Sequence, residues 1–93
     1  MKPRITITAR HTDGLLEIWV NEAGRDLLVE GLQSLNEKWD HFHLGTEETA
    51  MDVPVQTIPY RDGDVAHARG KVLFRPDKWD AEYFPHVLTL KDP

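Results

Sequence analysis

The chain has 93 residues, of which 40% are hydrophobic and 29% are charged, and its formal net charge is −5. These totals are typical of one globular domain spanning residues 1–93 and exclude a disordered chain. The absence of cysteine excludes disulfide bonds, thiolate zinc sites and thiol nucleophiles. The acidic balance disfavours direct binding to DNA or RNA, whereas it would attract a basic protein partner.

Nothing in the sequence predicts contact with a membrane. No apolar run approaches the roughly 20 residues that a membrane span needs. The first ten residues, MKPRITITAR, alternate polar and apolar side chains and do not resemble a signal peptide. We therefore expect a cytoplasmic protein.

Two strands joined by a tight turn are predicted at the start of the chain. Residues 4–10, RITITAR, have the period of two that is typical of a half-buried strand. Asp13 and Gly14 form a strong turn signal, and residues 15–20, LLEIWV, form the return strand. In that strand the alternation predicts even-numbered residues in the core and odd-numbered residues on the opposite face. The two sets are Leu16, Ile18 and Val20 inside, and Leu15, Glu17 and Trp19 outside.

An amphipathic helix is predicted from Glu22 to about Lys38, with Asn21 as its cap. Its polar face is acidic, which indicates a helix that packs on a sheet and does not lie in a membrane. Gly24 and Gly31 lie on or near the apolar side. A glycine inside a helix costs about 1 kcal/mol relative to alanine, and we expect a close approach to the sheet to offset this cost.

Residues 40–45, DHFHLG, return to a period of two and predict a third strand. Phe42 and Leu44 would then face the helix, whereas His41 and His43 would face away from it. The two histidines are thus one residue apart because a strand presents alternate side chains to each face.

The C-terminal half is predicted to be rich in strands, at about residues 55–60, 71–75 and 86–90, with one helical turn at 76–85. The fold class is therefore α+β, in two layers. One amphipathic helix packs on one face of a mainly antiparallel sheet of four to five strands. Since a single helix covers one face only, the other face is predicted to be open.

Glu17, His41 and His43 could converge if their strands are neighbours. Two histidines and a carboxylate can bind zinc and leave a position open for water. This set supports an alternative interpretation, a small metal-binding module or metal-dependent enzyme. Nucleophilic catalysis is not indicated, because the only serine, Ser34, lies in the predicted helix without a nucleophile elbow.

The first interpretation is a protein-binding domain that has no catalytic residue, metal or cofactor. Tryptophan is favoured as an anchor at protein interfaces, and an acidic rim speeds the arrival of a basic partner. The open face and the acidic loop after it would supply the contacts. The predicted contact residues are Trp19, Trp39, His41, His43, Glu47 and Glu48. A homodimer formed through the open face is a third possibility.

A family resemblance sharpens this interpretation. Residues 17–48, EIWVNEAGRDLLVEGLQSLNEKWDHFHLGTEE, contain a strand, a leucine-rich helix and an Asp-His-x-His-Leu strand that runs into a loop with Thr and Glu. Residues 70–79, GKVLFRPDKW, look like the apolar and basic strand that follows. This pattern resembles a family of small bacterial immunity proteins, number 32 in the polymorphic-toxin series. The resemblance implies a non-enzymatic protein that binds and neutralises a cognate toxin.

Overall fold

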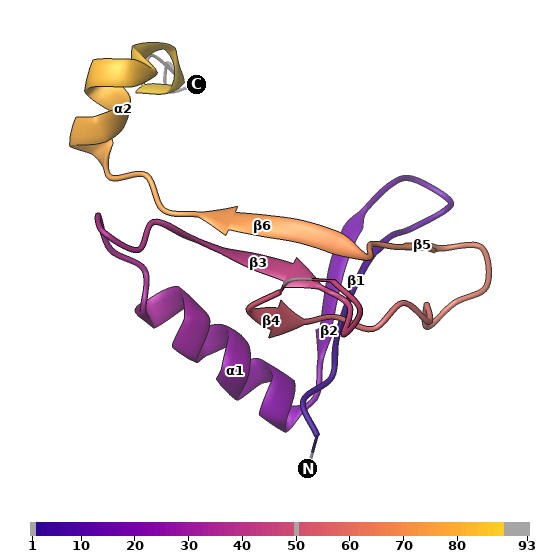
Figure 1. The fold of residues 1–93 in the computed structure, drawn as a ribbon. Coiled ribbons are helices and arrows are strands. Elements are labelled where there is room, and N and C mark those ends of the chain that lie inside the picture. The colour runs from indigo at the N-terminus through magenta and orange to yellow at the C-terminus, as the bar shows by residue number, and fades with distance from the viewer. Residues whose placement is uncertain (1, 50, 89–93) are drawn as a thin grey trace.

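The computed structural model describes residues 2–49 and 51–88 (Figure 1). In chain order the elements are β1 (Ile5–Ala9), β2 (Leu16–Val20), α1 (Glu22–Gln33), β3 (His41–Gly45), β4 (Val53–Pro54), β5 (Val65–Ala66), β6 (Arg69–Leu73), α2 (Asp77–Tyr83) and the 3₁₀ helix η1 (Pro85–Leu88). The strands form two three-stranded sheets, β2-β1-β5 and β4-β3-β6. Every pairing is antiparallel except that of β3 with β4. No helix in these described ranges is long and apolar enough to cross a membrane.

The α+β class is confirmed, whereas the predicted single helix on one sheet of four to five strands is wrong in its details. The segment 55–60 is not a strand, because the Gln56 side chain forms hydrogen bonds with both the N–H and the C=O group of Ile58. Gln56 Nε2 donates to the Ile58 carbonyl over 2.8 Å, and the Ile58 N–H donates to Gln56 Oε1 over 2.8 Å. At the predicted last strand, residues 85–88 form η1, and residues 89 and 90 lie outside the described residues.

Helix α1 begins and packs as its sequence predicts. Asn21 Oδ1 accepts hydrogen bonds from the N–H groups of Gly24, over 2.7 Å, and of Arg4, over 2.9 Å. A Cβ atom at Gly24 would overlap the Arg4 carbonyl oxygen, and one at Gly31 would lie 3.3 Å from the Phe42 ring. Both glycines therefore allow the close approach that was expected of them.

A small core lies where α1 packs on the sheet β4-β3-β6, and β1 of the other sheet contributes to it. Phe42 is 2% exposed, whereas His43 is exposed on the opposite side of β3, so the alternation predicted for this strand is confirmed. The buried apolar residues are Ile5, Phe42, Val53 and Val55, and those packed around them are Ile7, Leu27, Leu28, Leu35, Leu44 and Val72.

The burial predicted for β2 is wrong. Leu16, Ile18 and Val20 were expected in the core, but their exposed fractions are 61%, 54% and 40%. Helix α1 lies beneath the other sheet (Figure 1), and β2 is the outermost strand of its own sheet. The side chains of these three residues are therefore left uncovered.

Helices α2 and η1 extend away from both sheets and carry the C-terminal aromatic residues (Figure 1). The Trp79 ring lies 4.8 Å from that of Tyr83 and 5.3 Å from that of Phe84, and the Arg75 guanidinium lies 4.5 Å from it. These side chains form a cluster of their own, in which Tyr83 and Phe84 remain 57% and 44% exposed.

Candidate functional site

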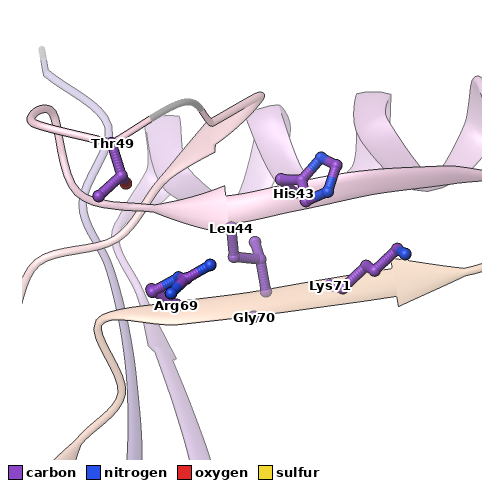
Figure 2. Close-up of a pocket in the computed structure, with 6 residues that line it drawn as sticks. All are labelled: His43, Leu44, Thr49, Arg69, Gly70 and Lys71. Carbon is purple, nitrogen blue, oxygen red and sulfur yellow. The ribbon is translucent and has the colours of Figure 1, made fainter.

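The surface of β3 and β6 that is turned away from α1 is the open face. It is defined by cross-strand pairs, because directly opposite residues point to the same side of a sheet. The pairs on this side are His41 with Leu73, His43 with Lys71, and Gly45 with Arg69. The open face therefore carries two histidines and two permanent cations, and Figure 2 shows three of these four side chains along the two strands.

The two histidines lie on the open face, as the sequence predicted, and a carboxylate lies beside each one. His41 Nδ1 is 2.8 Å from Asp40 Oδ1, and His43 Nδ1 is 3.6 Å from Asp52 Oδ2. The hydrogen bond with His41, helped by the nearby Arg75 guanidinium, lowers the pKa of Asp40 below its usual value. The imidazole rings are 5.1 Å apart and nearly perpendicular. Each imidazole thus has a local acidic partner of its own.

Arg69 and Lys71 form no ion pair with any residue in the described part of the chain, and both are exposed. They border an open hollow of about 720 Å³ on this face (Figure 2). The lining residues are His43, Leu44, Thr49, Arg69, Gly70 and Lys71. This edge of an otherwise acidic protein is therefore locally basic.

The alternative metal site, Glu17 with His41 and His43, is not assembled. Glu17 lies in β2, in the other sheet, where its carboxylate forms an ion pair with Arg61. Among residues 2–49 and 51–88 no group of three histidine, aspartate or glutamate side chains could hold a metal ion. The geometry gives the metal-dependent interpretation no support.

Trp19 lies on the side of β2 that the alternation predicted, but that side is covered. Its ring stacks on Tyr60 with centroids 4.2 Å apart and planes 9° apart. Its Nε1–H donates to Thr8 Oγ1 over 3.0 Å, and the Arg61 guanidinium lies 5.4 Å from the ring. Trp19 is half-buried within the chain, so the structure does not present it as a free anchor for a partner.

Asp64 stabilises the same region and was missed by sequence reasoning. Its side chain is fully buried, and Oδ1 accepts hydrogen bonds from the His11 backbone N–H over 3.0 Å and contacts His11 Nδ1 at 2.8 Å. Arg61 Nε donates to Oδ2 over 3.1 Å. The hydrogen bonds from His11 are the main reason that the pKa of Asp64 is lowered. The turn sequence RDGD was the available signal, but it does not reveal a partner 53 residues away in sequence.

The remaining predicted contact residues lie in separate places. Trp39 is 54% exposed and borders a hollow on the α1 side of β3, which it shares with Gly31 and Phe42. Glu47 pairs with Lys2 over 3.1 Å, and Glu48 lines a third hollow. Of the six predicted residues, only the two histidines share the open face.

An exposed apolar surface on the sheet β2-β1-β5 was not predicted. We call it the β2 face. Ala9 pairs with Leu16 on one side and with Val65 on the other, so the side chains of all three lie in one row. Val65 is 59% exposed. The β2 face consists of Leu16, Ile18, Val20 and Val65.

Comparison with known proteins finds no matching family model, no matching curated protein and no matching solved structure.

Proposed function

We propose that this chain is a non-enzymatic protein-binding domain that binds and neutralises a bacterial toxin, as an immunity protein does. The observation that carries the proposal is the β2 face. Four aliphatic side chains, each 40% exposed or more, lie on the two outer strands of one sheet, three on β2 and one on β5, with β1 between them. Soluble monomers rarely expose large contiguous apolar patches, and such patches commonly mark protein interaction sites.

The size of the surface supports the same conclusion. The chain exposes 7032 Å², whereas a compact monomer of its mass exposes about 5,500 Å². Its radius of gyration is 15.6 Å, against about 12 Å for a compact domain of this length. A standard protein interface buries about 800 Å² on each partner. The extra exposed area exceeds that of one such interface, and the protruding helices α2 and η1 contribute part of it.

The acidic balance supports a basic partner. A net charge of −5 raises the encounter rate with a cationic surface, an effect that is strongest at low salt. Glu48 is exposed and forms no ion pair with a described residue, so its charge is available for this steering. Trp39, also exposed, remains a proposed contact residue.

Neutralisation is tested by expressing the products of the adjacent genes in a sensitive host, each with and without the chain. The proposal predicts that the chain restores growth and that the two purified proteins form a stoichiometric complex. A chain that restores no growth and binds no product of a neighbouring gene would overturn the proposal.

A further inference from the structure

Strand β6 is the outer strand of its sheet, and nothing in the described chain pairs with its free edge. The hydrogen bonds between β3 and β6 determine which backbone groups of β6 point to that edge. The Phe74 N–H donates to the Asp40 carbonyl over 2.7 Å, so the even-numbered residues of β6 bond to β3. The N–H and C=O groups of Arg69, Lys71 and Leu73 therefore point outward.

The opposite edge of β3 agrees with this assignment. The carbonyls of His43 and Gly45 accept from the N–H groups of Asp52, over 3.0 Å, and Val55, over 2.8 Å. Odd-numbered residues of β3 thus bond toward β4, and even-numbered residues bond toward β6. Three residues of β6 are left with six backbone groups that an added strand could pair.

The side chains of the same three residues lie on the open face, and two of them are cations without an ion pair among the described residues. Pairing of β6 with β6 of a second copy would bring Lys71 and Arg69 near their equivalents, which like-charge repulsion opposes. A strand with carboxylates at the matching positions would instead gain attraction. Leu73, at 49% exposure, favours an apolar side chain opposite it.

We propose that the free edge of β6 binds an extended acidic peptide segment as an additional antiparallel strand. Its backbone pairs with Arg69, Lys71 and Leu73. From the N-terminus of the peptide, its alternate side chains are an apolar one opposite Leu73, an acidic one opposite Lys71 and an acidic one opposite Arg69. Main-chain hydrogen bonds supply the affinity, and the two carboxylates beside the cations supply the specificity. This inference does not rest on the proposed function, which concerns the β2 face on the other sheet.

The test is a titration of isotope-labelled chain with an acetylated, amidated peptide, Thr-Val-Thr-Glu-Thr-Glu-Thr, followed by amide chemical shifts. We expect saturable shifts, largest at Arg69, Lys71 and Leu73. A peptide with lysine in place of both glutamates should bind at least 10-fold more weakly. A peptide N-methylated at both glutamates retains the carboxylates but loses two of its N–H donors to β6, and its methyl groups obstruct the close approach of the strands, so it should also bind at least 10-fold more weakly.

The variants Lys71→Gln and Lys71→Glu should weaken binding by about 3-fold and at least 10-fold, because one charge is removed or reversed. Arg25→Glu makes the same charge change on α1 and should leave binding within about 2-fold. Thermal melting confirms that each variant is folded.

Three results would each overturn the inference. One is the absence of saturable shifts up to about 2 mM peptide, near the weakest affinity that such a titration resolves. Another is an N-methylated peptide that binds as tightly as the unmodified peptide, which would show that charge alone attracts the peptide to β6. The third is concentration-dependent shifts at β6 without peptide, which would assign the edge to a second copy of the chain.

Discussion

Replacing Trp19 with alanine distinguishes a structural role from a contact role for this side chain. Trp19→Ala removes the stack on Tyr60, worth about 0.5–1.5 kcal/mol, and the contact with Arg61, worth about 0.5–1 kcal/mol. It also leaves the buried Thr8 hydroxyl without its donor, at a cost of about 1–3 kcal/mol. With partial loss of burial, the free energy of unfolding should fall by about 3–5 kcal/mol. Tm should then fall by at least about 12 °C, as measured by thermal and urea unfolding.

Two further variants make this prediction specific. Trp19→Phe retains the ring but not the N–H donor, so it should lose only about 1–2 kcal/mol. Trp39→Ala is the matched control, because Trp39 is 54% exposed and should lose less than about 1 kcal/mol. If Trp19→Ala is no more destabilising than Trp39→Ala, then the covered side of β2 has been assigned wrongly.

Three other substitutions test the features that fix the fold. Asn21→Ala should lower the free energy of unfolding by about 2 kcal/mol in urea melts, because it removes the α1 cap and the tie to Arg4; a loss below about 0.5 kcal/mol would refute that role. Gly24→Ala should destabilise the chain although alanine is the better helix former, because its Cβ would overlap the Arg4 carbonyl; a higher Tm would disprove the close contact. The lowered pKa of Asp64 contributes stability that is present above the usual aspartate value of about 4 and is lost as the pH falls through the folded-state value. Asp64→Asn should therefore flatten the fall in Tm between about pH 5 and 2, and an unchanged pH profile would show that other carboxylates cause it.

Local sequence patterns predicted the features that depend on neighbours along the chain. Asn21 as a cap, the glycine contacts of α1 and the orientation of Phe42 follow from helix and strand periods. These features also place His41 and His43 on the open face.

The features that failed depend on contacts between distant segments. The alternation in β2 was read correctly, but it cannot show which side of the strand is covered. That depends on Tyr60 and Arg61, more than 40 residues later, which cover Trp19, and on α1, which lies on the other sheet. The missing strand at residues 55–60 has a local cause instead, because the Gln56 side chain forms hydrogen bonds with both backbone groups of Ile58, which a strand pattern does not reveal.

The most direct test of the β2 face is the dissociation constant of the toxin complex for a matched pair of variants, Ile18→Lys and Val29→Lys. Both replace an exposed aliphatic side chain, 54% and 44% exposed, with the same charge, but Val29 lies on α1 outside the β2 face. A contact at the centre of the interface should cost at least about 2 kcal/mol, so Ile18→Lys should weaken binding about 30-fold or more. Val29→Lys should change it by no more than about 2-fold. Equal affinities for the two variants would contradict the assignment of the β2 face as the toxin-binding surface.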